Sequence, residues 1–68
     1  MKYNKLKKLI ISKYKSMYRF CKIVNLSQSS LSYIFSGKRD LTWQNMKNFG
    51  EALSIPHDQY YEYFFRED

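Results

Sequence analysis

Apolar residues recur at helical spacing along nearly the whole chain. Near the amino terminus, Leu6, Leu9 and Ile10 form a stripe that Tyr14 extends. Spacings of three and four residues place such side chains on one face of a helix. Only two glycines and one proline are available to interrupt the pattern. The spacing predicts an all-α fold of five helices, over residues 4–14, 17–24, 28–36, 43–53 and 57–65, in a single domain of residues 1–68.

Residues 16–37 form the most informative stretch, because they predict two short helices with a tight connection. Met17, Phe20, Cys21 and Val24 lie at i, i+3, i+4 and i+7, which is one apolar stripe of a helix. A second apolar stripe begins only a few residues later. The stretch therefore predicts a pair of helices that pack against a common core.

Polar residues mark the ends of the predicted helices. Asn25 tolerates the left-handed conformation that ends a helix. Asn4 is a possible N-cap of the first helix, and Ser16, Ser27 and Thr42 precede the second, third and fourth helices and are suitable N-caps. Pro56 disfavours helical geometry in the residue before it, so the fourth helix ends upstream of it.

The helix predicted over residues 28–36 has an outward face without charges. Leu31, Ile34 and Phe35 point inward, and the cations Lys38-Arg39 follow the helix directly. The outward residues are polar or aromatic: Gln28, Ser29, Ser32, Tyr33 and Ser36. Small hydrogen-bonding groups with cations beside them are suited to reading base edges between phosphates.

The last two predicted helices contribute large apolar side chains. Trp43, Met46, Phe49 and Leu53 are expected to point inward from the fourth helix. The final helix is expected to carry one apolar side, made of Tyr60, Tyr61, Phe64 and Phe65. This side contains more rings than the core of so small a chain requires, so part of it is expected to contact a second protein surface.

The charge is unevenly distributed. Residues 1–24 contain eight lysines and arginines and no acid, whereas residues 51–68 contain five acids and one arginine. The net charge of +6 therefore resides at the front of the chain. Such an arrangement orients a molecule on a polyanion. A basic helix can also lie on an anionic membrane, but the apolar stripe of residues 4–14 is narrow and is needed to cover the helix pair.

Few residues suit catalysis or metal binding. Cys21 is the only cysteine and lies on an apolar stripe, and His57 is the only histidine and follows a proline. A disulfide and a Cys/His zinc site are therefore excluded within the chain. We expect no enzymatic activity and no metal or other cofactor. No apolar run has the length of a membrane span or signal peptide, so a cytoplasmic protein is expected.

The spacing of residues 5–61 resembles the helix-turn-helix of the phage repressor and Cro family, an XRE-type family of DNA-binding proteins. No matching feature is specific alone, and the resemblance depends on their joint spacing. The matching residues are Phe20-Cys21, Leu26-Ser27, Gln28-Ser29, Leu31-Ser32, Ile34, Ser36-Gly37-Lys38, Ala52-Leu53 and Ile55. The resemblance implies a five-helix repressor-like domain whose third helix enters the major groove of double-stranded DNA.

The resemblance also implies roles for individual residues. Base contacts are expected from Gln28, Ser29, Ser32 and Tyr33. Phosphate contacts are expected from Ser16, Met17 (through its backbone), Arg19, Lys22, Ser36, Lys38 and Arg39. The operators of this family are usually palindromic, so a homodimer is expected, with Tyr60, Tyr61, Phe64 and Phe65 of segment 57–65 at the interface. In the alternative, Tyr60 and Phe64 only complete the core, and the other rings are exposed singly. No small-molecule ligand is expected.

Two positions depart from the family pattern. Many members have Gln where this chain has Met17, and that glutamine holds a phosphate and supports the first Gln of the next helix. Here either the backbone N–H at the start of the helix binds the phosphate, or Ser16 and Tyr18 replace the glutamine. Many members also pair an Arg of the first helix with a Glu near the end of the third. The corresponding residues here are Ile10 and Phe35, both apolar, so no unpaired charge remains and a contact between them is expected.

A second function class remains open. Small helix-turn-helix domains also serve as antitoxins or antirepressors that bind another protein. The ring-rich segment 60–65 is compatible with such a partner as well as with a homodimer. The sequence therefore predicts a DNA-binding transcription regulator, with protein binding as the alternative.

Overall fold

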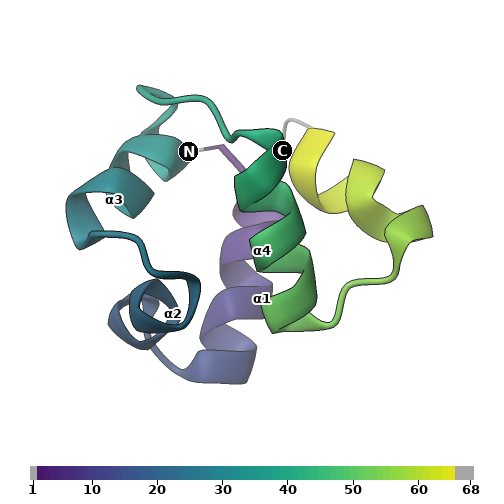
Figure 1. The fold of residues 1–68 in the computed structure, drawn as a ribbon, viewed down its shortest axis with the longest axis horizontal. Helices are drawn as coiled ribbons and strands as arrows, with labels where there is room; N and C mark the ends of the chain where they lie inside the picture. Colours follow the sequence, from purple (N-terminus) through teal and green to yellow (C-terminus); the bar gives the residue numbers. More distant parts are fainter. Residues whose placement is uncertain (1, 66–68) are drawn as a thin grey trace.

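The described part of the chain is entirely helical. A computed structural model describes residues 2–65, and no strand occurs within that range (Figure 1). The elements are α1 (Asn4–Tyr14), α2 (Met17–Val24), α3 (Gln28–Ser36), α4 (Trp43–Leu53), the 3₁₀ helix η1 (His57–Gln59) and the π-helix η2 (Tyr61–Phe65). The predicted all-α class is confirmed. Residue 1 and residues 66–68 of the predicted domain lie outside the described residues.

Side-chain caps explain where three of the helices begin. The hydroxyl oxygens of Ser16, Ser27 and Thr42 each accept a hydrogen bond from the backbone N–H three residues on, at 3.1, 3.0 and 3.1 Å. Each cap satisfies a donor that the first turn of a helix leaves without a partner inside the helix. These three predicted caps are confirmed, and they determine the start of α2, α3 and α4. The cap expected from Asn4 is wrong, because Asn4 is already the first residue of α1 and no side chain caps this helix.

Left-handed residues end the four α-helices. Lys15, Asn25, Gly37 and Ser54 have φ values of 71°, 58°, 84° and 55°. In each case the backbone N–H of this residue bonds to a carbonyl of the last turn. Asn25 then leaves only residues 25–27 between α2 and α3, as the sequence predicted.

Two phenylalanines form the centre of the core. Phe20 of α2 and Phe49 of α4 are both fully buried, and their ring centroids lie 5.0 Å apart in an edge-to-face arrangement. Tyr14 packs on Phe20 at 5.5 Å, and its hydroxyl donates to the carbonyl oxygen of Ala52 at 2.6 Å. This aromatic cluster therefore joins α1, α2 and α4. Ile10 and Phe35 are buried in the same core, while their direct contact stays a prediction.

The inward position expected for Trp43 is wrong, because 63% of this side chain is exposed. Met46, Phe49 and Leu53 do face the core from α4, as expected. Trp43 occupies the first turn of α4, at the end of the stripe, and Leu41 is already buried two residues before it. At this end of α4 the core is therefore completed by Leu41, and the indole lies outside it.

The carboxyl-terminal segment has two faces instead of the single apolar side expected. Tyr60 and Phe64 are buried, with ring centroids 5.1 Å apart, whereas Tyr61 and Phe65 are 66% and 54% exposed. Tyr60 and Phe64 are four residues apart and face the core, and Tyr61 and Phe65, one residue further along in each case, face solvent. The segment forms a 3₁₀ turn that continues into a π-helix instead of a regular α-helix.

Gly50 provides the site where this segment packs onto α4. A Cβ atom added at Gly50 would lie 2.0 Å from the Tyr60 hydroxyl oxygen and 2.5 Å from its Cζ. Any side chain at position 50 would therefore displace the Tyr60 ring. The exposed ion pair from Lys5 to Glu62, at 2.6 Å, links α1 to the same segment, but exposed pairs contribute little to stability.

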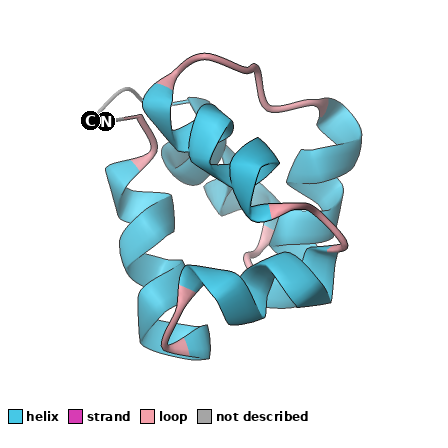
Figure 2. Ribbon diagram, turned by 90° about the vertical axis from the view of Figure 1, so that its left-hand side faces the viewer, coloured by secondary structure: helices cyan, strands magenta, loops and turns pink. Residues whose placement is uncertain are grey.

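The helix pair lies on the opposite side of the molecule from η1 and η2. Figure 2 looks onto the side that carries α3, which crosses in front of the other helices. In Figure 1, α2 and α3 form the left side, α1 and α4 the centre, and η1 and η2 the right side. Only the inner face of α3 packs on the core, and its outer face lies at the surface of the molecule.

Gly50→Ala is expected to destabilise the protein by about 1–3 kcal/mol, because the added methyl group overpacks against Tyr60. Urea denaturation followed by circular dichroism measures this change. Lys47→Ala, on the exposed side of the same helix, is the control and is expected to change stability by less than about 0.5 kcal/mol. Equal stability of both variants would show that Tyr60 does not pack on Gly50.

Candidate nucleic-acid interface

The outward face of α3 is polar and without charge. All five predicted outward residues are exposed: Gln28, Ser29, Ser32, Tyr33 and Ser36. The inner face, with Leu31, Ile34 and Phe35, is at most 2% exposed, so the helix cannot rotate without losing its core contacts. The sequence-predicted base-contacting residues are therefore brought together on one surface of one helix.

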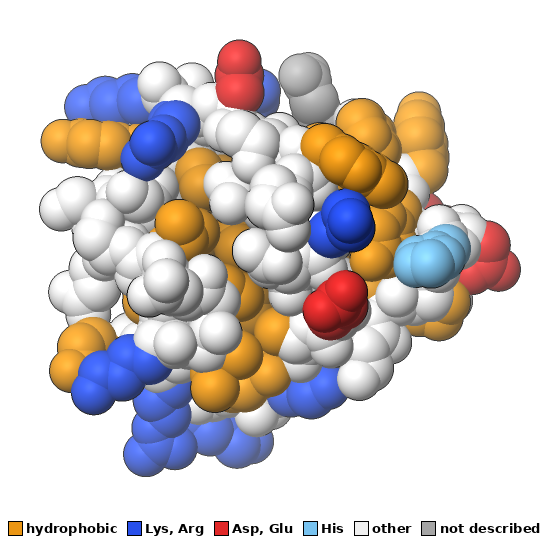
Figure 3. All heavy atoms as spheres, in the orientation of Figure 1, with side chains coloured by type: hydrophobic (Ala, Val, Ile, Leu, Met, Phe, Trp, Pro, Cys, Tyr) orange, Lys and Arg blue, Asp and Glu red, His pale blue; other side chains and the backbone are white. Residues whose placement is uncertain are grey.

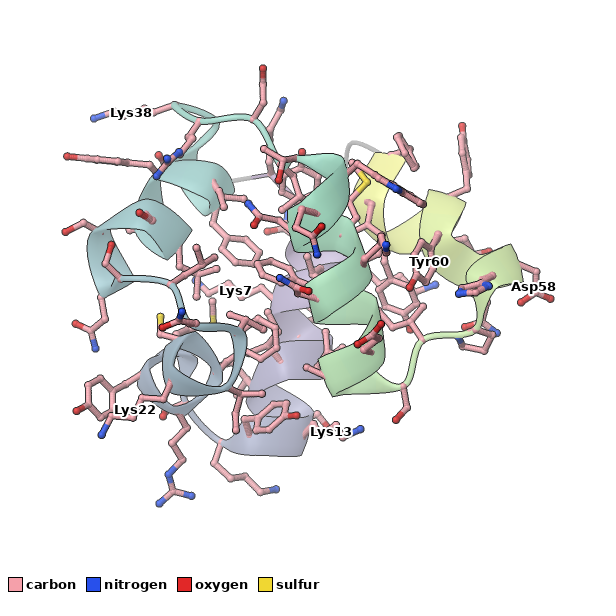
Figure 4. The ribbon with its side chains drawn as sticks, in the orientation of Figure 1. Lys7, Lys13, Lys22, Lys38, Asp58 and Tyr60 are labelled. Atoms are coloured by element: carbon pink, nitrogen blue, oxygen red, sulfur yellow. The ribbon has the colours of Figure 1, made fainter. Side chains whose placement is uncertain are left out.

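Cations lie at both ends of this face. Lys38 and Arg39 follow α3, and Arg19 and Lys22 are exposed on α2. Figure 4 shows Lys38 and Lys22 projecting from the upper and lower corners of the same side of the molecule. In Figure 3 these corners are blue, and the strip over α3 between them is mostly white. The neutral face of α3 thus lies between two positive edges.

Each edge contains a lysine held over a tyrosine ring. The Lys22 ammonium lies 4.6 Å from the centroid of Tyr18, and the Lys38 ammonium lies 5.8 Å from the centroid of Tyr33. Tyr18 and Tyr33 are 52% and 49% exposed. Cation–π contacts of this kind restrict the positions that a lysine side chain samples. The two ammonium groups are therefore partly preorganised on the surface.

A chain of hydrogen bonds fixes Arg39 beside α3. The Arg39 Nη1 donates to the Ser30 hydroxyl oxygen at 2.8 Å, and the Ser27 hydroxyl lies 2.9 Å from that of Ser30. Arg39 therefore extends back along the helix toward its amino-terminal turn. Its guanidinium adds positive charge to one flank of the neutral face.

Two of the serines expected to contact phosphate already make hydrogen bonds inside the protein. The Ser16 hydroxyl oxygen accepts from the Arg19 N–H as the N-cap, and Met17 is half-buried beside the helix pair. Ser36 donates its hydroxyl proton to the Tyr33 carbonyl oxygen at 3.1 Å. The expected phosphate contacts of Ser16 and Ser36 must therefore compete with bonds inside the protein.

The amino-terminal residues extend the upper edge. The Lys2 N–H donates to the Phe35 carbonyl oxygen at 3.0 Å, and the Tyr3 ring meets Phe35 edge-on at 6.2 Å between centroids. The Lys2 Cδ lies 3.6 Å from the position of a Cβ at Gly37. Lys2 therefore lies beside the loop that carries Lys38.

The sequence predicted Tyr18 only as a possible replacement for the missing glutamine at the start of α2, and it did not predict Lys2 as a site residue. The four-residue spacing of Tyr18 and Lys22 was visible and predicts their contact on a helix. No local pattern predicts that Lys2 reaches Gly37, because this contact joins segments far apart in the sequence.

A small cavity lies behind the neutral face, where α1, α2 and α3 meet. Its volume is about 190 Å³, and Cys21 forms part of its wall. Cys21 is 4% exposed, and burial raises the pKa of its thiol by disfavouring the thiolate. The expected buried, structural position of this cysteine is confirmed.

The carboxyl-terminal rings are on the far side from α3. Tyr61 and Phe65 are exposed and stacked at 6.4 Å between centroids. Tyr60 and Phe64 are 9% and 2% exposed, so their expected place in a dimer interface is wrong: their surface is already buried in the protein's own core. Only two of the four predicted interface rings are available to a partner.

Two acidic side chains lie away from α3, whereas Asp40 is exposed in the loop after α3, next to Arg39. Asp58 projects from η1 on the right of Figure 4, opposite Lys22 and Lys38. Glu62 is in η2 and pairs with Lys5. Within residues 2–65 there is no group of three His, Cys, Asp or Glu side chains that is suited to hold a metal ion. In the same range, no helix combines the length and the apolar character that crossing a bilayer requires.

Comparisons of the chain with protein families, with curated proteins and with solved structures each found no match. The chemistry of the surface must therefore be judged from its own residues.

Cys21 is expected to react slowly with iodoacetamide in the folded protein. Its thiol is buried and its raised pKa lowers the thiolate fraction, so at pH 7.5 the rate is expected to be at least about tenfold below that in urea. The alkylation rate should also rise toward its maximum at a higher pH in the folded than in the unfolded protein. Mass spectrometry of timed samples measures both. Equal rates would show that Cys21 is accessible.

Proposed function

We propose that this protein is a sequence-specific DNA-binding transcription regulator that acts as a homodimer. The observation that carries the proposal is the neutral polar face of α3 between two cationic edges. Cations bind phosphates regardless of sequence, whereas uncharged hydrogen-bonding side chains distinguish bases. A surface that separates these two chemistries along one exposed helix is suited to the major groove.

The dimensions are compatible with this mode of binding. An α-helix with its side chains is about 10–12 Å across, and the major groove of B-DNA is about 12 Å wide. With α3 in the groove, Lys38 and Arg39 on one edge and Arg19 and Lys22 on the other meet phosphates of opposite strands.

Individual side chains have separate roles in this proposal. The amide of Gln28 contacts an adenine edge, and Ser29 and Ser32 contact neighbouring bases. The exposed Tyr33 ring contacts a thymine methyl group or a sugar. The resemblance to the phage repressor and Cro family supports this assignment, and a cytoplasmic, Cro-like repressor is part of it.

The homodimer is proposed to form through Tyr61 and Phe65. Figure 3 shows hydrophobic side chains gathered over η2 and the start of α4, away from α3. Trp43, in the first turn of α4, adds its exposed indole to the apolar surface of the chain. A two-fold dimer presents one α3 from each subunit to the two halves of a palindromic operator.

Protein binding is the second candidate function, as in an antitoxin or antirepressor. The observation in its favour is the same set of exposed rings, Trp43, Tyr61 and Phe65. Aromatic side chains are enriched in protein interfaces. Under this alternative the rings contact a different protein, and α3 has no preference for any DNA sequence.

Gln28→Ala and Lys38→Ala are expected to differ in kind. Gln28→Ala is expected to cost about 1–3 kcal/mol on an operator selected from random duplexes and little on scrambled DNA. Lys38→Ala is expected to weaken both similarly and to lower the slope of log affinity against log salt by about one. Fluorescence anisotropy at several salt concentrations measures these changes. If the wild-type protein selects no sequence, the regulator proposal fails and protein binding replaces it.

The dimer proposal has its own test. Analytical ultracentrifugation at micromolar concentration is expected to show a dimer for the wild type and a monomer for the double variant Tyr61→Ser/Phe65→Ser, because polar residues remove the apolar contact. Tyr18→Ser, at an exposed tyrosine of α2, is the control and is expected to remain dimeric. A wild type that stays monomeric even on DNA would exclude the dimer.

A further inference from the structure

The cationic edge on α2 contains a lysine that is held over an aromatic ring. The Lys22 ammonium lies 4.6 Å from the centroid of Tyr18, whereas the Lys38 ammonium lies 5.8 Å from that of Tyr33. An ammonium is attracted to the face of an aromatic ring within about 6 Å of its centroid. Figure 4 shows Lys22 projecting from the corner of the molecule at α2. The pair on α2 is therefore the closer of the two contacts and lies well inside this range.

The helix itself brings these two side chains together. Tyr18 lies in the first turn of α2 and Lys22 in the last turn, four residues on, so both occupy one side of the helix. A different side of α2 is buried, with Phe20, Cys21 and Val24 in the core. The tyrosine and the lysine are thus carried by a helix that the core holds in a fixed orientation.

The Tyr18 ring has little part in the core. Its neighbours Tyr14 and Met17 pack against the core, whereas Tyr18 is 52% exposed. The exposed ring instead lies beneath a lysine at the edge of the candidate interface. This position indicates that the ring acts on Lys22 and not on the packing of the helices.

Two roles of Tyr18 at this edge use different atoms. If Tyr18 replaces the glutamine that the phage repressor and Cro family often has at the start of this helix, its hydroxyl binds a phosphate directly. If Tyr18 positions Lys22, the face of its ring is required and the hydroxyl is not. The contact in the structure joins the Lys22 ammonium to the ring. The geometry therefore favours the second role.

We propose that Tyr18 is a positioning residue whose ring holds the Lys22 ammonium in place for contact with a DNA phosphate. This inference rests on the proposed function. A free lysine side chain samples many rotamers and loses this freedom when it binds. The ring restricts Lys22 before DNA is bound, so less freedom is lost on binding. An ammonium has three N–H donors, and those that point away from the ring are available to phosphate oxygens.

Proton NMR of the labelled full-length protein without DNA tests the contact itself. Protons over the face of an aromatic ring resonate upfield, so the ε-methylene protons of Lys22 are expected upfield of their position in the unfolded chain. Tyr18→Phe keeps the ring and is expected to keep this shift. Tyr18→Leu keeps an apolar side chain without a ring and is expected to lose it. Equal shifts in the wild type and in Tyr18→Leu would overturn the proposal.

The affinity for DNA separates the ring from the hydroxyl. Tyr18→Leu is expected to weaken binding about two- to fivefold, the range of an exposed cation–π contact. The loss is expected to be equal on a selected operator and on a scrambled duplex, because phosphates carry no sequence information. Tyr18→Phe is expected to bind like the wild type in fluorescence anisotropy. A loss in Tyr18→Phe as large as that in Tyr18→Leu would assign the contact to the hydroxyl and overturn the proposal, as would wild-type affinity in Tyr18→Leu.

A double-mutant cycle shows whether the ring acts through the lysine. Lys22→Met is expected to weaken both duplexes and to lower the slope of log affinity against log salt by about one. Tyr18→Leu is expected to leave this slope unchanged, because the charge of Lys22 remains. In the double variant, Tyr18→Leu is expected to add no further loss to that of Lys22→Met.

Lys38→Ala provides the matched control for this cycle, because Lys38 lies over a different ring. Its loss of affinity and that of Tyr18→Leu are expected to add in the double variant. Additive losses of Tyr18→Leu and Lys22→Met would overturn the positioning role.

Failure of this inference differs from failure of the proposed function. A wild type that selects an operator, with additive losses at positions 18 and 22, loses only the positioning role. A wild type that binds scrambled DNA but selects no sequence contradicts the regulator proposal, and the cycle on scrambled DNA still decides the role of Tyr18. A wild type that binds no duplex DNA overturns both.

Discussion

The edge-to-face contact of Phe20 and Phe49 is the constraint on which the rest of the arrangement depends. It joins α2 to α4 at the point where both side chains are fully buried, and Tyr14 adds α1 to the same cluster. No residue that is polar or charged is buried within residues 2–65, so apolar contacts, with the hydrogen bond from Tyr14 to Ala52, hold these helices together. Because α3 follows α2 after three residues, the position of α2 largely determines where α3 lies. The contact between Phe20 and Phe49 therefore determines the orientation of the candidate interface, although neither ring belongs to that interface.

The two sides of the molecule have different chemistry because different elements supply them. The neutral face and its cationic edges come from α2, α3 and the loop after α3, whereas the exposed rings come from η2 and the first turn of α4. A change of side chain on one side therefore has little effect on the other. The cavity is the exception, since Gln28 and Ser32 line it and also lie on the exposed face of α3. It is the place where the interior and the candidate interface are connected.

Local signals explain how much of this structure the sequence predicted. Apolar spacing and the caps Ser16 and Ser27 were sufficient for the bounds of α2 and α3 and for the outward face of α3. The predictions were wrong where the burial of a side chain depends on its position along a helix or on packing between segments that are far apart in the sequence. Trp43 fits the apolar period of α4 but lies beyond the end of the core. The sequence left two alternatives for the rings of residues 60–65, and the one in which Tyr60 and Phe64 complete the core holds for these two residues. The cavity and the position of Lys2 depend on contacts between separate elements, which no local pattern contains.

The left-handed helix ends have a consequence for how this chain tolerates mutation. Lys15, Asn25 and Ser54 hold a conformation that glycine adopts without steric cost, and only Gly37 uses glycine there. For a residue with a side chain the conformation costs about 1–2 kcal/mol, less for asparagine. Lys15 and Ser54 lie outside α3, so glycine at either position would relieve this cost without altering the outward face. Glycine at these helix ends can therefore stabilise the fold, and this gain can offset the loss of stability caused by substitutions on the exposed face of α3.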